Sequence, residues 1–302
     1  MKKLYLHVGC GKTGSSALQV WLSQISKELR NEGVHYPLFN RGPLGEYTIS
    51  SGNGEKFLKA IKNRSLGNIA GSEINDECST LLYSSEVFQT LTEEDSKYLL
   101  SKAETGGYQV HIIAYVRDVY DIAYSSFQQL VKRHTYTKTF LDFALSRRSL
   151  QQFAVIEKFS QWFEHLHVIH YDTIEGNNIS IPFCRRIGIG PNAVPRMTDR
   201  KVNRSLSVYE TELMRLANRL YMETHGKQSM RFSASLSDQI ISMGPEKETE
   251  ILFDQRILDH FTATMSQQVN FINSKFFKQP LLKILRKEGK CLVDQVPVLP
   301  PD

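Results

Sequence analysis

The sequence contains few cysteines, and no two of them lie close together. Four are present among 302 residues, at Cys10, Cys78, Cys184 and Cys291. This spacing lacks both the close pairs of a zinc site and the compact framework of a disulfide-rich secreted domain. The cysteine pattern therefore favours a protein of a reducing cytoplasm.

Long apolar runs are missing as well. No stretch of about 18 apolar residues, the length that a membrane-spanning helix needs, occurs in the chain. The N-terminal segment MKKLYLHVG is too short for the core of a signal peptide and leads directly into a glycine-rich loop. We expect no membrane span and a cytoplasmic location.

A strong excess of one charge is also absent. The 37 basic and 32 acidic residues give a formal net charge of +5, while hydrophobic residues make up 41% and charged residues 23%. These fractions are typical of a globular protein. The basic excess is too diffuse to predict nucleic-acid binding, and it suits small anionic ligands better.

Short apolar runs alternate with helical patterns in the first two thirds of the chain. The runs that we interpret as strands are residues 4–8, 80–83, 110–116 and 166–171. Helical spacing of apolar residues follows in 15–30, 119–132 and the segment LQQFAVIEKFSQWFEH. This alternation predicts an α/β fold, a three-layer sandwich with a central parallel sheet.

After about residue 205 the pattern changes to helices alone. SVYETELMRLANRLYMETH and ILDHFTATMSQQVNFINSKF are both amphipathic at helical spacing. We predict a single domain over 1–302, in which 1–204 form the α/β core, 205–290 a helical cover of the sheet and 291–302 an extended tail. Residues 40–75, rich in Gly, Asn and Ser, are expected to form loops around one short helix.

A glycine-rich loop follows the first predicted strand. The sequence LHVGCGKTGSSALQ places Gly9, Gly11 and Gly14 around Lys12, and it puts Ser15 and Ser16 where the N-cap of a helix belongs. Glycines let backbone amides close on an anion, and a helix N-terminus and a lysine add positive charge. The loop predicts a phosphate or sulfate site, although a plain glycine turn is the alternative when the loop is taken by itself.

The nearest rival motif is the Walker A loop, G-x-x-x-x-G-K-[ST], which needs a glycine five residues before the Gly-Lys glycine. Leu6 occupies that position here. The loop instead resembles the 5′-phosphosulfate loop of sulfotransferases that use 3′-phosphoadenosine 5′-phosphosulfate (PAPS), commonly P-K-[ST]-G-[ST]-[ST], with glycine in place of the proline. The resemblance implies a P-loop-like sulfotransferase fold and a PAPS site formed by Gly11, Lys12, Thr13, Gly14, Ser15 and Ser16.

A second motif begins at the end of the strand 110–116, in the sequence VRDVYDIAYSSFQQ. It resembles the family's R-[DN]-P-x-[DE]-x-x-x-S-x-[FWY] pattern, in which the Arg and the Ser hold the 3′-phosphate of PAPS. The matching residues are Arg117, Asp118, Asp121, Ser125 and Phe127, and Val119 replaces the usual proline. The resemblance implies that Arg117 and Ser125 bind this phosphate. A lone Arg-Asp pair would otherwise indicate a surface ion pair.

A third region, TDRKVNRSLSVYE, resembles the N-x-S-x-S stretch of bacterial carbohydrate-type sulfotransferases. Asn203, Ser205 and Ser207 match it, and the resemblance adds Asn203 and Ser205 to the nucleotide site. The alternative is a helix cap with solvated charges. The family's C-terminal Arg-Lys-Gly segment is interrupted here by Glu288, so no role is transferred to it.

Transfer of a sulfuryl group to a hydroxyl also needs a proton acceptor. Glu86, which follows the strand in STLLYSSEVF, is the first candidate, and its Ser-Ser-Glu setting resembles bacterial relatives. The alternative for Glu86 is an early-turn glutamate favoured by the helix dipole. His7 is the second candidate but is expected to be a core or loop-supporting histidine, and His134 is expected to line the acceptor mouth.

Together these resemblances imply an enzyme that moves the sulfuryl group of PAPS to an acceptor hydroxyl, with Lys12 stabilising charge and Glu86 taking the proton. A carbohydrate acceptor is implied, adenosine 3′,5′-bisphosphate (PAP) is the second product, and no metal is required. The alternatives are a nucleotide kinase or other P-loop ATPase, and a non-catalytic anion-binding protein.

Overall fold

The computed structural model describes residues 1–38, 52–67, 78–174, 178–190, 192–197, 205–243, 250–288 and 290–294. The chain divides into two compact units, each described by itself below. The first comprises Met1–Val116 and Gln151–Val202, and the second comprises Arg117–Leu150 and Asn203–Asp302. The organisation into a single domain stays a prediction.

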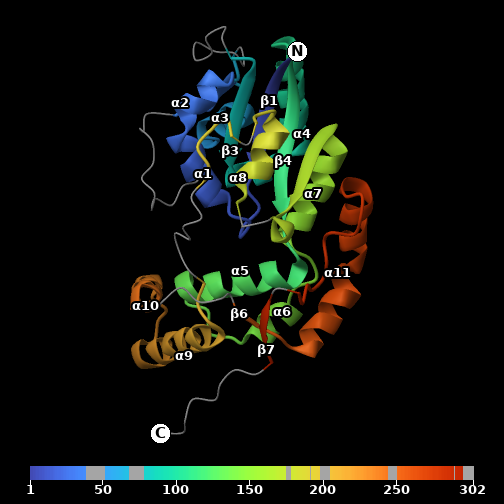
Figure 1. Cartoon of the computed structure of the whole chain (residues 1–302). Helices are drawn as coiled ribbons and strands as arrows, with labels where there is room; N and C mark the ends of the chain where they lie inside the picture. Colours follow the sequence, from blue (N-terminus) through green and yellow to red (C-terminus); the bar gives the residue numbers. More distant parts are fainter. Residues whose placement is uncertain are drawn as a thin grey trace. The chain divides into compact units, whose positions relative to one another are not determined.

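A five-stranded sheet in which all paired strands are parallel is the centre of the first unit (Figure 1). Its spatial order is β2-β3-β1-β4-β5. The strands are β1 (Lys2–Val8), β2 (Val34–His35), β3 (Thr80–Ser85), β4 (Tyr108–Val116) and β5 (His165–His170). The four predicted strands are therefore confirmed, whereas the two-residue strand β2 was not expected from the sequence.

Helices cover both faces of this sheet. Side chains of alternate parity along β1 point to opposite faces, so that Leu4 and Leu6 pack into one buried cluster and Tyr5 into another. The first cluster includes side chains of α3 (Glu55–Lys62), α4 (Glu93–Thr105) and α7 (Gln151–Trp162). The second includes those of α1 (Ser15–Gln24), α2 (Ser26–Asn31) and α8 (Ser180–Ile187). The prediction of a three-layer sandwich is confirmed.

The first helical segment differs in one detail from the expectation. The continuous helix predicted over residues 15–30 is two helices, α1 and α2, which meet at Ile25. Nothing in the sequence around Ile25, such as a proline or a glycine, indicates this boundary. The short helix expected within residues 40–75 is α3, while 39–51 and 68–77 lie outside the described residues.

The second unit is mainly helical. Aromatic side chains form its core, where Tyr120, Tyr124 and Phe127 of one helix contact Phe140 of another. Its helices are α5 (Val119–Arg133), α6 (Phe140–Leu145), α9 (Val208–His225), α10 (Met230–Met243) and α11 (Gln255–Phe276). The helices that the sequence predicted at α5, α9 and α11 are confirmed.

The expectation of helices alone after residue 205 is wrong. Strands β6 (Glu250–Leu252) and β7 (Cys291–Val293) pair in parallel in the second unit. Each has three residues, which is too short for an alternating pattern to be detected in the sequence.

Two further findings bear on the sequence predictions. All four cysteines are free thiols in the structure. Among the helices within the described ranges, none combines the length and the apolarity that a bilayer span requires.

Two buried histidines of the first unit make its stability dependent on pH. Burial lowers the pKa of His7 from 6.5 to about 3. Burial, followed by the charges of His165, His167 and Lys3, lowers the pKa of His111 to about 4. Between pH 6.5 and about 4 the unfolded chain therefore binds protons that the folded chain does not.

We expect the free energy of unfolding to fall as the pH is lowered through this window, by up to about 1.4 kcal/mol per pH unit for each histidine. Urea unfolding at intervals from pH 7 to pH 4 measures this slope. The variant His111→Gln should show a smaller slope, because glutamine does not titrate. An unchanged slope would show that His111 is not one of the linked groups.

Candidate active site

The loop between β1 and α1 has an unusual backbone. Lys12 and Gly14 both adopt left-handed conformations, with φ of 67° and 78°. Left-handed residues of this kind occur in backbone nests, in which N–H groups converge on an anion. The left-handed conformation costs a residue with a side chain about 1–2 kcal/mol, and such strain accumulates at functional sites.

Hydroxyl groups brace the loop from within. The Thr13 hydroxyl donates to the carbonyl of Cys10 at 2.5 Å, and the Ser15 hydroxyl donates to the same carbonyl at 3.5 Å. Both side chains are buried. Gly14 is the N-cap of α1, so the expectation that Ser15 or Ser16 caps the helix is wrong; the two serines are its first residues. A left-handed glycine occupies the capping position instead.

Two glycines of the loop are positions where a side chain has no room. A Cβ on Gly14 would lie 2.8 Å from Ile179 Cδ1. A Cβ on Gly9 would lie 2.8 Å from Ser15 Oγ and 2.9 Å from Glu86 Cγ. The missing side chain at Gly9 thus allows Glu86 to approach the loop.

Each residue of the Ser-Ser-Glu sequence has a different role, with Ser84 and Ser85 at the end of β3 and Glu86 directly after it. Ser84 Oγ lies 2.7 Å from Nδ1 of His7, and Ser85 caps the short 3₁₀ helix η1 (Glu86–Thr90) by accepting from the N–H of Val87. Glu86 begins that turn and packs against Gly9. Its position beside the loop agrees with the role expected from the sequence, which remains a prediction.

The charge state of Glu86 is set by two opposing effects. Partial burial raises the pKa of its carboxyl group, and the nearby Lys12 ammonium group lowers it. The net shift is upward, because the first effect is the larger. A raised pKa makes a carboxylate a better proton acceptor near neutral pH.

His7, the second candidate base, lies in the core of the first unit. Its side chain is completely buried, and its ring contacts Tyr115 and Phe183 edge-on. Since burial lowers its pKa to about 3, the imidazole is neutral at ordinary pH. The expectation of a core histidine is confirmed. His134, which was expected to line the acceptor mouth, is an exposed residue of the second unit at the C-cap of α5.

The second motif lies at the start of α5 in the second unit. Arg117 follows the last residue of β4 in the chain and lies 3.6 Å from the carboxylate of Asp121, one helical turn on. Ser125 comes one further turn along α5, and its side chain is half-buried. Positions 121 and 125 therefore share a face of the helix.

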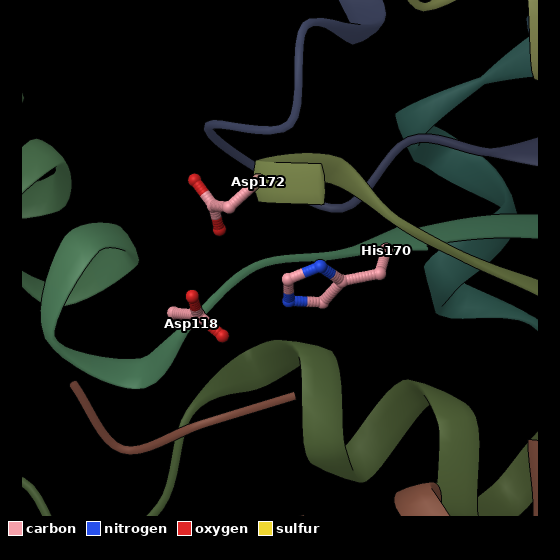
Figure 2. A group of neighbouring side chains, drawn as sticks. All are labelled: Asp118, His170 and Asp172. Carbon is pink, nitrogen blue, oxygen red and sulfur yellow. The ribbon is translucent and has the colours of Figure 1, made fainter. Parts of the chain in front are cut away.

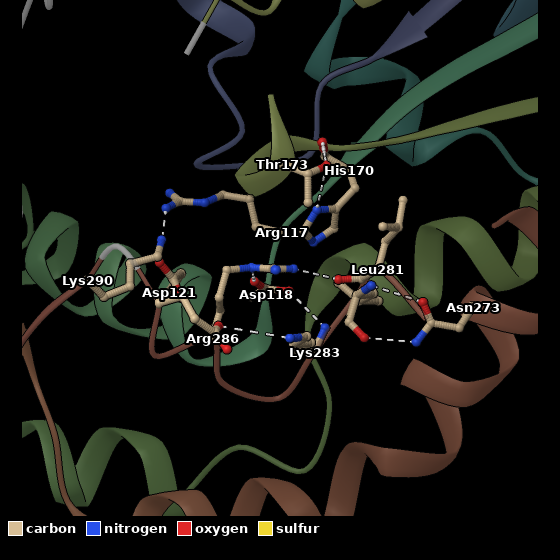
Figure 3. Close-up of polar contacts among 12 residues, drawn as sticks. Arg117, Asp118, Asp121, His170, Thr173, Asn273, Leu281, Lys283, Arg286 and Lys290 are labelled. Carbon is tan, nitrogen blue, oxygen red and sulfur yellow. Dashed lines mark hydrogen bonds and ion pairs between the residues drawn. The ribbon is translucent and has the colours of Figure 1, made fainter. Parts of the chain in front are cut away.

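A segment near the C-terminus braces this motif, as Figure 3 shows. The buried carboxylate of Asp118 accepts from the backbone N–H of Lys283 at 2.8 Å and from Arg286 Nε at 2.9 Å. Lys290 pairs with Asp121. The N–H of Val119 donates to the carbonyl of Lys283 at 3.0 Å, a bond that a proline at this position could not form.

Two polar residues at the carboxyl end of β5, His170 and Asp172, were not predicted to be site residues. His170 ends this strand, and its Nδ1 lies 3.2 Å from Thr173 Oγ1. Asp172 follows in the turn η2 (Tyr171–Thr173), and Figure 2 draws both residues, together with Asp118 at the start of α5. The carboxyl ends of parallel strands form the edge where open α/β sheets bind ligands. Polar residues at the carboxyl end of a predicted strand are the signal that could have indicated His170 and Asp172.

The third sequence region is only partly described. Ser207 caps α9 in a reciprocal arrangement with Glu210, which agrees with the helix-cap alternative for this stretch. Ser205 is exposed just before it. Asn203 lies outside the described residues, as do 198–202 and Arg204, so its assignment to the nucleotide site stays a prediction.

Comparison with solved structures gives remote likenesses, among them the following two. A sulfotransferase from Alicyclobacillus acidocaldarius is 15% identical with a TM-score of 0.39, over 74% of this chain and 96% of that chain. Retinol dehydratase in complex with androsterone and the inactive cofactor PAP is 12% identical with a TM-score of 0.38, over 95% of this chain and 83% of that chain. No protein-family profile and no curated protein matches. At these TM-scores neither likeness carries an argument about function.

The left-handed backbone of Lys12 makes a prediction about stability. Glycine adopts this conformation without strain, so we expect Lys12→Gly to be more stable than Lys12→Ala by about 1 kcal/mol. Urea unfolding of both variants measures the difference. Lys59, an exposed residue inside α3, is the matched control. There the order should reverse, with the glycine variant about 1 kcal/mol less stable. The same order at both positions would contradict a strained Lys12.

Proposed function

We propose that this protein is a PAPS-dependent sulfotransferase, which moves the sulfuryl group of PAPS to a hydroxyl of an acceptor, a carbohydrate by resemblance. The observation that carries the proposal is the loop with left-handed Lys12 and Gly14, with the side chain of Glu86 packed against it at Gly9. This combination supplies an anion site and a proton acceptor within one unit of the protein.

The loop binds the 5′-phosphosulfate end of PAPS. Backbone N–H groups of residues 11–16 at the start of α1 donate to the phosphate oxygens, supported by the positive end of the helix dipole. The Lys12 ammonium group neutralises charge that develops on the oxygen between phosphorus and sulfur. Such preorganised charge stabilisation is commonly the largest contribution to catalysis.

Glu86 acts as the base. Its carboxylate takes the proton of the acceptor hydroxyl as the acceptor oxygen forms a bond to sulfur and the bond from sulfur to the phosphate oxygen breaks. The products are the sulfated acceptor and PAP. The raised pKa of Glu86 suits this task, because a stronger base is a better proton acceptor when it is ionised.

The second motif selects the nucleotide. Arg117 and Ser125 bind the 3′-phosphate, which ATP lacks, and Asn203 and Ser205 contribute to the same nucleotide site. Asp121 pairs with both Arg117 and Lys290, and so brings two cations together at the motif. This arrangement supports the proposed phosphate-binding role of Arg117.

Loss of the Lys12 charge should abolish transfer. We expect Lys12→Ala to lower the turnover of PAPS by about 100- to 1,000-fold, because one preorganised electrostatic contact is removed. Release of PAP from PAPS in the presence of a panel of glycans and small alcohols measures this. Lys59→Ala, in the same unit, should retain full turnover. Full activity of Lys12→Ala would refute the proposed function, and turnover of ATP with magnesium in place of PAPS would indicate a kinase or an ATPase.

Removal of Arg117 should weaken nucleotide binding. Charge-assisted hydrogen bonds contribute about 1.5–3 kcal/mol, so we expect Arg117→Ala to raise the Kd for PAP by about 10- to 100-fold. Calorimetry with PAP, and in parallel with ATP plus magnesium, provides the measurement. Arg256→Ala is the control, since Arg256 is an exposed arginine already paired with Asp254. Equal affinities of the wild type and Arg117→Ala for PAP would remove Arg117 from the site.

A further inference from the structure

Two side chains of the turn after β3, those of Glu86 and Gln89, both contact Gly9 of the loop between β1 and α1. The turn η1 is a 3₁₀ helix, in which residues three apart lie on one side. Glu86 packs against Gly9, and Gln89 donates a hydrogen bond from its Nε2 to the carbonyl of Gly9. This bond joins residues 80 positions apart in the sequence.

The rest of the turn is anchored independently of the loop. Ser85 caps its first residues, and Phe88 is completely buried in the core. At its end, the ammonium group of Lys158 on α7 donates to the carbonyl of Gln89 and, at 3.2 Å, to that of Leu91. The side chain of Gln89 therefore extends from a fixed turn to the first residue of the loop.

The hydrogen bonding of Gln89 argues against a role in packing alone. Its Oε1 is buried and has no hydrogen-bond partner among the residues that the structure describes, whereas its Nε2 is paired with Gly9. A buried acceptor without a partner costs about 1–3 kcal/mol, a cost that an apolar side chain of similar size would not carry. The hydrogen bond that Nε2 donates to the loop gives a reason for a glutamine at this position, because an apolar side chain could not form that bond.

We propose that Gln89 is a positioning residue, which fixes the turn that carries Glu86 against the loop that carries Lys12. This inference rests on the proposed function, because it assigns the geometry of the proposed base. Displacement of a catalytic group by about 1 Å can lower a rate by as much as 100-fold. The bond from Gln89 holds Gly9, three residues before Lys12, at a fixed position relative to the base.

The variant Gln89→Met tests the proposal, since methionine has a similar length and lacks the amide. We expect kcat for PAPS turnover to fall about tenfold and KM for PAPS to change less than twofold. The acid limb of the pH profile should move to lower pH, because a loosened turn admits water to Glu86 and removes part of the burial that raises its pKa. Gln151→Met, on the exposed first residue of α7, is the control and should match the wild type.

A second readout does not depend on an acceptor. NMR titration of the Glu86 side-chain carboxyl carbon should give a lower pKa in Gln89→Met than in the wild type. If Gln89→Met does not fold, Lys158→Met loosens the same turn from its other end and should shift both readouts in the same direction. A wild-type kcat together with an unshifted Glu86 titration would overturn the inference. Full activity of Lys12→Ala would instead refute the proposed function, so the two failures are distinguishable.

Discussion

The backbone of the loop between β1 and α1 is the constraint on which the rest of the candidate site depends. Its residues Lys12 and Gly14 are left-handed, and hydrogen bonds from the Thr13 and Ser15 hydroxyls to the Cys10 carbonyl hold the loop in this conformation. At Gly9 and Gly14 of this loop, a Cβ atom would lie less than 3 Å from neighbouring side chains. Gly9 is bordered by Ser15 and Glu86, and a side chain there would displace one of them. The position of the proposed base beside the loop therefore depends on the glycine at position 9.

Burial shifts the pKa values of the two candidate bases in opposite directions, because it disfavours the charged form of both a carboxyl group and an imidazole. It raises the pKa of the Glu86 carboxyl group, which becomes a stronger base, and it lowers the pKa of His7 to about 3, which leaves a weak one. The same environment of β1 and β3 thus favours the carboxylate. His7 serves instead in the core, where its Nδ1 contacts Ser84 and fixes the residue two positions before Glu86.

Features with a local pattern were predictable from the sequence, and features that depend on distant contacts were not. Four strands of the sheet, the helix α5 and the glycine loop follow from apolar periodicity and from glycine spacing. The three-residue strands β6 and β7 are too short to produce a period. The bond from Gln89 to Gly9 spans 80 residues, and nothing in the sequence indicates that its two ends meet. The same holds for Lys283, which is 165 residues from its partner Asp118.

The departure of the second motif from its usual pattern has a physical explanation in the second unit. With Val119 in place of proline, the start of α5 has an N–H group that pairs with Lys283, and the segment bound there brings Arg286 and Lys290 to the motif. Three cations, Arg117, Arg286 and Lys290, then surround the two carboxylates of Asp118 and Asp121, so that these five groups retain one net positive charge. The two carboxylates hold the three cations together at the start of α5. Guanidinium groups bind phosphate through paired hydrogen bonds, so this arrangement suits the proposed contact of Arg117 with the 3′-phosphate.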